Sequence, residues 1–192
     1  MARLILIRHG ESVANAQGRF TRGPHEPLSR RGREEALARA RRVQARFDPV
    51  ALYASPFVRA LETARLIGGV LGLAPVVVDE LREQDFGALR GQPYESLRPE
   101  RRQDRWSFRP PGGETLEEVF ARVGPALDAI ATRHLGAEVL VVSHGGVMAA
   151  LHRWASRGAG GDPVISINCG GYLLQRGTRG YEGPFPLGDD ED

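Results

Sequence analysis

The sequence LILIRHGE, residues 4–11, decides the fold class of this chain. Four consecutive apolar residues are typical of a strand buried inside a sheet, and the arginine and histidine follow where that strand ends. In an open α/β sheet, ligands bind outside the carboxyl ends of the strands. We therefore expect Arg8 and His9 to face a crevice and not the core.

A second strand is expected to end in the same way. Residues 139–146 read VLVVSHGG, so that His144 follows another apolar run and precedes two glycines. A lone histidine beside a glycine is more often a turn residue than a functional one. Two strands that both end in histidine and glycine predict a shared site.

Apolar runs and helical patterns alternate along the chain. Helices are predicted after Ser29, which can cap the first one up to Phe47, and after Ser55-Pro56, with the serine as cap and the proline at the first helical position. Thr115 and Glu118 form a capping box for a third helix, in which Gly124-Pro125 is a candidate kink. A last helix is expected over 146–156. Strands are predicted near 3–8, 50–54, 75–78, 138–143, 164–168 and 171–175.

This alternation predicts an α/β fold, a three-layer α/β/α sandwich around a mostly parallel central sheet. The 192 residues, of which 41% are hydrophobic and 26% charged, suit one domain with a sizeable core. We expect that domain to cover residues 1–176. Residues 177–192, rich in glycine, proline and terminal acid, are expected to form a flexible tail or to lie on the surface.

Composition excludes several classes of function. All 26 basic residues are arginine, so that no lysine is present for Schiff-base chemistry, and a net charge of +2 is too small to indicate nucleic-acid binding. The single Cys169 excludes an intrachain disulfide and is interpreted as a small buried hydrophobe, which fits a reducing cytoplasm. The apolar runs are too short for a signal peptide or a membrane span. A cytoplasmic protein is expected.

Four ordered blocks resemble the signature of the histidine phosphatase superfamily, the phosphoglycerate mutase-like enzymes. They read RHGES at 8–12, SPFVRALETA at 55–64, LRE and FG within 81–87, and SHGG at 143–146. The resemblance extends over most of the chain and implies a phosphoglycerate mutase-like fold. It also implies a nucleophilic His9 that forms a phosphohistidine, which water then hydrolyses.

The resemblance assigns further residues to the site. Arg8, Asn15, Arg59 and His144 would bind the phosphate, and His144 would also take part in catalysis. Thr21, Arg101 and Arg102 are candidates for binding the rest of the substrate. No cofactor or metal is expected, because the sequence contains neither a His-Glu-x-x-His spacing nor a glycine-rich loop with lysine.

The leaving alkoxide needs a proton, and the family spacing selects Glu83 as its donor. A carboxyl group near a dianionic phosphate has its charged form disfavoured, so that it can hold a proton. The same group could then activate water. Asp85, two residues on, is the competing candidate because both side chains share one side of an extended segment.

The expected activity is hydrolysis of small phosphorylated metabolites. Gly145-Gly146 stands where glycolytic mutases typically carry Gly-Asn, and the segment 83–112 is compact, whereas FGALRG at 86–91 and Arg101-Arg102 look mutase-like. Arg90 replaces a glutamate that many members carry. The alternatives are a phosphoglycerate mutase and a non-catalytic phosphate-binding regulatory domain; the intact His9, Glu83 and His144 oppose the latter.

The segment between the proposed acid and the turn at 110–113 is dense in arginine. It is either a solvated helix face or a patch that holds a second anionic group of the substrate. The expected partner is a small phosphorylated substrate, with no nucleic acid and no membrane; a homodimer is left open. The arginines are Arg90, Arg98, Arg101, Arg102, Arg105 and Arg109.

Overall fold

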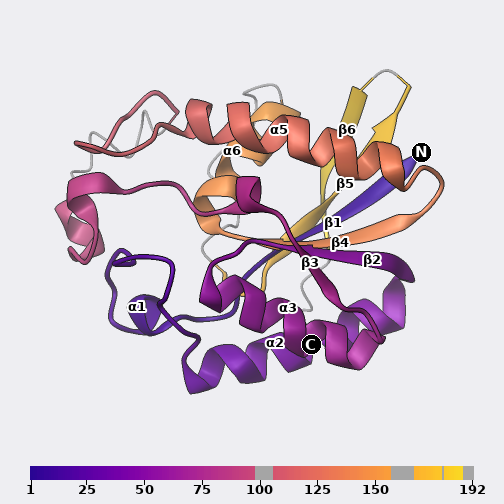
Figure 1. The fold of residues 1–192 in the computed structure, drawn as a ribbon, viewed down its shortest axis with the longest axis horizontal. Coiled ribbons are helices and arrows are strands. Elements are labelled where there is room, and N and C mark those ends of the chain that lie inside the picture. Colours follow the sequence, from indigo (N-terminus) through magenta and orange to yellow (C-terminus); the bar gives the residue numbers. More distant parts are fainter. Residues whose placement is uncertain (98–105, 157–166, 179, 188–192) are drawn as a thin grey trace.

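The computed structural model describes residues 1–97, 106–156, 167–178 and 180–187. A mixed sheet with the strand order β3-β2-β4-β1-β5-β6 forms its centre (Figure 1). β1, β2, β3 and β4 run parallel, and β5 and β6 are antiparallel to their neighbours. The strands are β1 (Ala2–Arg8), β2 (Pro49–Ala54), β3 (Pro75–Val77), β4 (Glu138–Ser143), β5 (Gly171–Gly177) and β6 (Gly180–Pro186).

Helices cover both faces of this sheet, which confirms the predicted three-layer α/β/α architecture. α2 and α3 lie on one face, and α5 and α6 lie on the other (Figure 1). The bounds are α1 (Val13–Ala16), α2 (Arg30–Arg46), α3 (Val58–Leu71), α5 (Leu116–Arg133) and α6 (Gly145–Ala155), and short 3-10 turns lie at Asp79–Leu81, Gly87–Leu89 and Tyr94–Ser96.

Strand β1 shows why a continuous apolar run belongs at the centre of the sheet. Its side chains alternate between the two faces. Leu4 and Leu6 pack into the core beneath α5 and α6, while Ile5 and Ile7 pack into the core beneath α2 and α3. Both layers therefore bury their apolar faces against the same strand.

Several local predictions hold. Ser29 caps α2 by accepting a hydrogen bond from the Gly32 amide, and Thr115 forms the expected capping box with Glu118. α5 continues through Gly124-Pro125 as one helix. Cys169 is buried, and this burial raises the pKa of its thiol to about 12.

The prediction that Ser55 caps a helix is wrong. α3 begins at Val58 with Phe57 as its N-cap residue, two residues later than expected. The Ser55 hydroxyl accepts a hydrogen bond from the Phe57 amide, and its oxygen lies 2.6 Å from His144 Nε2. The Ser55 side chain therefore contacts His144, which follows β4, and does not cap α3.

The carboxyl-terminal part also differs from the prediction. Residues 164–166 of the strand expected over 164–168 lie outside the described residues, and Ile167 and Asn168 lie in a bend and turn. The segment expected to form a flexible tail or to lie on the surface contains the edge strand β6, which pairs with β5 from Tyr172 opposite Pro186 to Gly177 opposite Gly180. Because backbone hydrogen bonds hold an edge strand, an apolar period is not required there.

Within the described residues, no helix is both long and apolar enough to span a bilayer.

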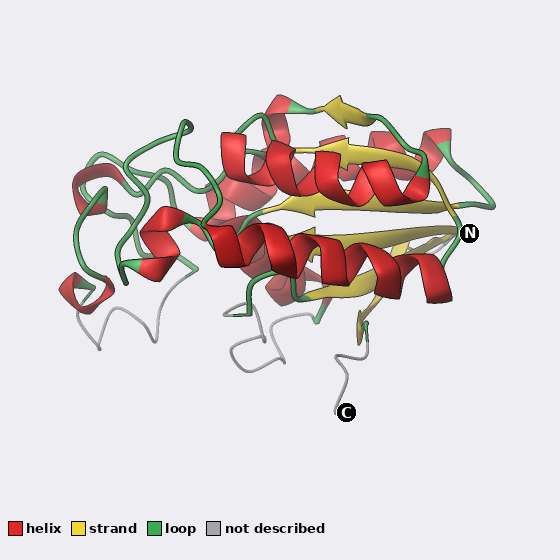
Figure 2. Cartoon of the chain, turned by 90° about the horizontal axis from the view of Figure 1, so that it is seen from below, coloured by secondary structure: helices red, strands yellow, loops and turns green. Residues whose placement is uncertain are grey.

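The register places the carboxyl ends of three strands at one level. Arg8 on β1 lies opposite Ser143 on β4, and Ala54 on β2 lies opposite Val142. The residues that follow these strands therefore meet at one end of the sheet, where the long loops gather (Figure 2).

Candidate active site

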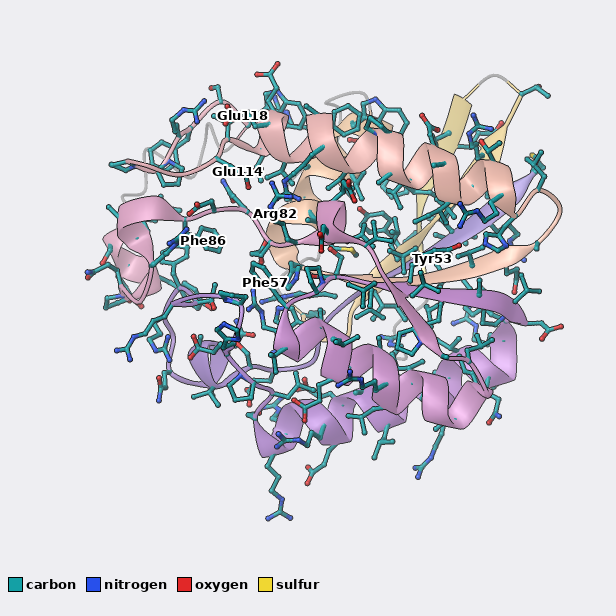
Figure 3. The ribbon with its side chains drawn as sticks, viewed as in Figure 1. Tyr53, Phe57, Arg82, Phe86, Glu114 and Glu118 are labelled. Atoms are coloured by element: carbon teal, nitrogen blue, oxygen red, sulfur yellow. The ribbon has the colours of Figure 1, made fainter. Side chains whose placement is uncertain are left out.

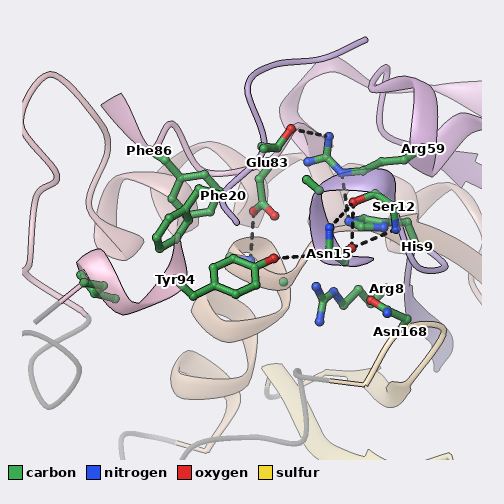
Figure 4. A pocket seen from close by; sticks show the side chains of 15 residues that line it. Arg8, His9, Ser12, Asn15, Phe20, Arg59, Glu83, Phe86, Tyr94 and Asn168 are labelled. Atoms are coloured by element: carbon green, nitrogen blue, oxygen red, sulfur yellow. Dashed lines mark hydrogen bonds between the residues drawn. The ribbon is translucent and has the colours of Figure 1, made fainter. Parts of the chain in front are cut away.

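A cavity of about 540 Å³ opens where β1, β2 and β4 end. Its walls come from segments far apart in the sequence, including the β1 end, α1, the start of α3, the loop around Glu83 and the start of α6 (Figure 4). Residues that line it are Arg8, His9, Ser12, Asn15, Phe20, Thr21, Arg59, Glu83, Phe86, Tyr94 and Gly146.

His9 is held in one tautomer by its two hydrogen bonds. Arg59 Nε lies 3.0 Å from His9 Nε2, and His9 Nδ1 lies 2.7 Å from the Gly10 carbonyl oxygen. Because a guanidinium group only donates, Nε2 must accept, and the ring proton is on Nδ1, where it is donated to Gly10. The Nε2 lone pair therefore points away from the strand, as a nucleophile requires.

The charge state of His9 also suits a nucleophile. Burial lowers its pKa well below the ordinary value, and the cations Arg59 and Arg8 lower it further. The side chain is 2% exposed. His9 is therefore a neutral imidazole at neutral pH.

The loop after His9 rests against the beginning of α2. A Cβ atom at Gly10 would lie 2.3 Å from the Gly32 carbonyl oxygen, and one at Gly32 would lie 2.0 Å from the Glu11 carbonyl oxygen. Ser29 reinforces the contact, because its hydroxyl donates to Glu11 Oε1 at 2.6 Å and its amide to the Glu11 carbonyl at 2.8 Å. Two facing glycines thus set the position of this loop.

Two guanidinium groups give the cavity its positive charge. Arg59 is almost fully buried, in the first turn of α3, and its Nη1 also lies 3.4 Å from Thr21 Oγ1 and from the Gly23 carbonyl. Arg8 ends β1 at the same cavity. Burial lowers the pKa of both groups, against an opposing effect of the Glu83 charge, but arginine stays protonated in proteins. The pair can bind an anion from two sides.

His144 stands beside His9, with ring centroids 5.1 Å apart. Its Nε2 lies 2.6 Å from Ser55 Oγ, and its Nδ1 lies 4.0 Å from Glu83 Oε2. Nδ1 is buried without a hydrogen-bond partner among the described residues. Burial, followed by the charge of Arg59, lowers the pKa of His144 well below its ordinary value, so the ring is neutral.

Glu83 is oriented by backbone groups. Its Oε1 accepts hydrogen bonds from the Gln84 amide at 2.9 Å and from the Gly146 amide at 3.0 Å, which leaves Oε2 toward His144. Arg122 of α5 donates to the Glu83 carbonyl at 3.0 Å and fixes the loop. A Cβ atom at Gly146 would lie 2.6 Å from Glu83 Oε1, so only glycine fits there without moving the carboxyl group.

The competing carboxylate, Asp85, is engaged elsewhere. It accepts hydrogen bonds from the Gly87 amide at 2.7 Å and from two nitrogens of Arg90, at 3.1 and 2.6 Å. Although burial acts in the opposite direction, these partners hold the pKa of Asp85 below its ordinary value. Asp85 therefore stays ionised and cannot hold a proton for a leaving group.

Asn15 reaches the cavity as part of α1. Its side-chain oxygen accepts hydrogen bonds from the Ser12 amide and hydroxyl, and its Nδ2 donates to the Tyr94 hydroxyl at 2.8 Å (Figure 4). Tyr94 comes from a separate 3-10 turn and packs edge-on against Phe20. No motif signals Tyr94, which lines the cavity and contacts Asn15 across 79 positions of the sequence.

The structure thus brings together His9, Glu83, Arg8, Asn15, Arg59 and Thr21 around one cavity. His144 is fully buried beside them, with its ring against that of His9. Arg101 and Arg102, proposed as substrate contacts, lie outside the described residues, as do Arg98 and Arg105. Arg109 is paired with Glu118 at 2.6 Å. The contacts of Ser55 and Arg122 have no signal in the sequence, because each residue acts through a partner distant in sequence.

Side chains that could ligate a metal also meet here. Ligand atoms of His9, Glu83 and His144 all lie within 4.8 Å of one another. Two guanidinium groups line the same cavity, and their charge favours an anion over a cation. The donor set therefore suits a phosphoryl group better than a metal ion.

Comparisons with known proteins show which family the chain belongs to. The family model of the histidine phosphatase superfamily (branch 1) matches residues 4–168. Phosphoglycerate mutase-like protein 4 of Arabidopsis thaliana is 33% identical over 163 residues, which cover 80% of this chain and 71% of that protein. Metal-independent phosphoserine phosphatase of the same plant is 34% identical over 158 residues, with coverages of 78% and 66%.

A solved structure shows the same fold. Mycobacterial glucosyl-3-phosphoglycerate phosphatase, in complex with VO3, superposes with a TM-score of 0.80 at 27% identity over 90% of each chain. The family model spans most of the chain, and its matched range contains both strand-end histidines, both arginines and Glu83. This chain belongs to the histidine phosphatase superfamily, branch 1.

Proposed function

We propose that this protein hydrolyses phosphate monoesters of small metabolites through a phosphohistidine on His9. The observation that carries the proposal is the neutral His9 ring, with its Nε2 lone pair turned toward a cavity that two arginines line. A neutral imidazole attacks, and fixed cations stabilise charge that develops on the phosphoryl oxygens. The phosphatases among its relatives support the same reaction.

In the first step, the phosphate lies against Arg8 and Arg59, with His144 and Asn15 as further donors. Arg59 Nε, which bonds to His9 Nε2 in this structure, transfers its hydrogen bond to a phosphoryl oxygen. His9 Nε2 then forms a bond to phosphorus while the bond to the ester oxygen breaks. Glu83 gives its proton to that oxygen, and the alcohol leaves.

In the second step, the ionised Glu83 accepts a proton from water. The water oxygen attacks phosphorus, the bond to His9 Nε2 breaks, and inorganic phosphate leaves with His9 neutral again. Glu83 is placed for both roles by the amides of Gln84 and Gly146, which bind one carboxyl oxygen and leave the other for proton transfer. Each proton is returned, so that no cofactor is consumed.

We favour hydrolysis over mutase action. An asparagine at position 146, as in the Gly-Asn pair of glycolytic mutases, would collide with Glu83 as this chain holds it. The acid of this protein is therefore positioned in a way that depends on Gly146. The mutase and the non-catalytic regulatory domain remain as alternatives for the experiment.

We also propose that the preferred substrates carry a second anionic group. A cavity of about 250 Å³ adjoins the first one and shares Thr21, Glu83 and Phe86 with it. It is also lined by Phe57 and by three arginines, Arg22, Arg82 and Arg90. Phe57, Arg82 and Phe86 are labelled in Figure 3. Asp85 lines the cavity too and binds Arg90, so the excess positive charge comes from Arg22 and Arg82 and favours a carboxylate or a second phosphate. Arg101 and Arg102 stay proposed contacts of the same group.

Rapid quenching of the enzyme with labelled substrate tests the reaction. The expected product is an acid-labile, alkali-stable phosphoenzyme that the His9→Ala variant lacks and that forms equally well with a chelator present. Labelling that persists in His9→Ala would overturn the assignment, and a chelator that abolishes turnover would remove the metal-independent reaction.

Incubation with 3-phosphoglycerate separates the alternatives. Release of inorganic phosphate, or no reaction, is expected. Formation of 2-phosphoglycerate that a bisphosphate stimulates and that exceeds phosphate release would identify a mutase. Phosphate binding without turnover of any phosphorylated metabolite or aryl phosphate would identify a regulatory domain.

A further inference from the structure

Ser55 lies at the end of β2 and bonds to the second histidine of the site. It is fully buried, its amide donates to the Val142 carbonyl of β4 at 3.1 Å, and its Oγ lies 2.6 Å from His144 Nε2. The ends of β2 and β4 are thus connected by one side-chain hydrogen bond. Its direction determines which nitrogen of His144 carries the proton.

The hydrogen bonds of the hydroxyl decide that direction. A serine hydroxyl has one proton to donate and two lone pairs. One lone pair accepts the Phe57 amide at 3.2 Å, and among the described residues His144 Nε2 is the acceptor within reach of the proton. If Nε2 carried the ring proton, the buried hydroxyl proton would have no acceptor, at a cost of about 1–3 kcal/mol.

We infer that Ser55 is a positioning residue that donates its hydroxyl proton to His144 Nε2 and so keeps the ring proton on Nδ1. Nδ1 is the buried atom without a partner among the described residues, 4.0 Å from Glu83 Oε2. With the proton there, the neutral ring carries its N–H on the side that faces Glu83, and under the proposed function this N–H is the donor to the phosphoryl group. With the opposite tautomer, it would present a lone pair to an anion.

This assignment gives His144 its function without a positive charge. The ring is fully buried and packs edge-on against His9 and Phe57, with centroids 5.1 and 5.2 Å away. The titratable and charged groups that face it are His9, Arg8, Arg59, Arg122 and Glu83. In that setting a neutral donor of fixed tautomer avoids adding another cation beside two arginines.

The inference rests on the proposed function for its catalytic meaning, but its test has a readout that does not depend on activity. Nitrogen-15 spectra of histidine distinguish a protonated Nδ1 from a protonated Nε2. For His144 we expect a protonated Nδ1 in the wild-type protein and a shift toward a mixture of tautomers in Ser55→Ala. A wild-type His144 protonated on Nε2 would overturn the inference, whatever the activity of the enzyme.

Kinetics provide the second readout. Loss of one hydrogen bond that favours the donating tautomer should lower kcat for phosphate release about 10-fold in Ser55→Ala, with KM nearly unchanged. Ser55→Thr keeps the hydroxyl and should restore both the spectrum and most of kcat. An unchanged kcat together with an unchanged spectrum in a folded Ser55→Ala would also overturn the inference.

Ser143→Ala is the matched control. Ser143 is equally buried at the end of β4, but its hydroxyl donates to the Leu81 carbonyl at 2.9 Å and not to a histidine. Both alanine variants should lose similar thermal stability, whereas only Ser55→Ala should change the His144 spectrum. A wild-type enzyme that hydrolyses no phosphate ester but shows a protonated Nδ1 would refute the proposed function and leave the tautomer assignment standing.

Discussion

Replacing Glu83 by glutamine should separate the acid function of this side chain from its position. Oε1 accepts the amides of Gln84 and Gly146, and the side-chain oxygen of glutamine can accept the same two hydrogen bonds. The amide nitrogen then takes the place of Oε2, 4.0 Å from His144 Nδ1. The substitution therefore removes a transferable proton while the surrounding contacts stay.

The size of the effect depends on the leaving group. General acid catalysis contributes roughly 10²- to 10⁴-fold, which corresponds to about 2.7–5.4 kcal/mol at 1.36 kcal/mol per tenfold change. We expect a loss of this size for alkyl phosphates, whose alkoxides are strongly basic. For an activated aryl phosphate the loss in kcat/KM should be within about threefold, because this parameter reports phosphoryl transfer to His9 and not the later attack of water, and a nitrophenolate leaves without a proton.

The assay is phosphate release from a series of esters whose leaving alcohols differ in basicity. The slope of log kcat/KM against the pKa of the alcohol should be shallow for the wild type and steep for Glu83→Gln. Asp85→Asn is the control, since Asp85 is ionised and bound to Arg90 and the Gly87 amide. Equal losses on both classes of ester, or a steeper slope in Asp85→Asn, would refute the assignment of the proton to Glu83.

Three further predictions concern the charges of the site. Arg59→Ala should lower kcat/KM for phosphate release by about 10²- to 10³-fold. Arg59→Lys should recover only part of this loss, because lysine lacks the planar guanidinium group that donates two parallel hydrogen bonds. Full activity of the lysine variant in steady-state phosphate release would contradict the role of the guanidinium geometry. The melting temperature should fall as the pH drops below about 6.5, the ordinary pKa of histidine. The reason is that His9 and His144 have lowered pKa values in the folded protein, so the unfolded chain takes up protons that the folded chain does not. In denaturant unfolding, these two groups should lower the free energy of unfolding by at most about 2.7 kcal/mol per pH unit; His9→Asn should reduce that slope, and an identical slope would contradict the buried neutral state. Arg22→Ala should raise KM severalfold for substrates with a second anionic group and leave a neutral aryl phosphate nearly unchanged, with the exposed Arg30→Ala as control; equal effects on both classes would remove Arg22 from substrate binding.

Much of the fold could be predicted because it depends on local periodicity. The apolar runs at β1 and β4 and the capping residues Ser29 and Thr115 act within a few residues of themselves, so the sequence carries their signal. β6 could not be predicted in this way. Its residues Gly180–Pro186 form a strand because β5 offers them hydrogen bonds, which is a property of the neighbour.

The site residues likewise fall into those with a local signal in the sequence and those whose roles depend on contacts between distant segments. His9 and His144 could be paired from the sequence because both follow buried strands, and the parallel register brings such positions to one edge of the sheet. The choice between Glu83 and Asp85 could not be made from a two-residue spacing alone. The family spacing favours Glu83, and the contacts of Asp85 with Arg90 and of Glu83 with Gly146 add a physical reason, because they join segments that the sequence does not relate.

The contact between Gly10 and Gly32 changes how the most prominent motif of the chain can be understood. A glycine after His9 allows a close approach of the backbone to a ligand, yet here a side chain at either glycine would strike backbone atoms of the other segment. Gly32 lies outside every motif block, at the start of α2, but it sets the same clearance as Gly10. The two positions therefore form one steric unit, and tolerance to substitution at Gly32 should follow that of Gly10 and not that of its exposed helical neighbours.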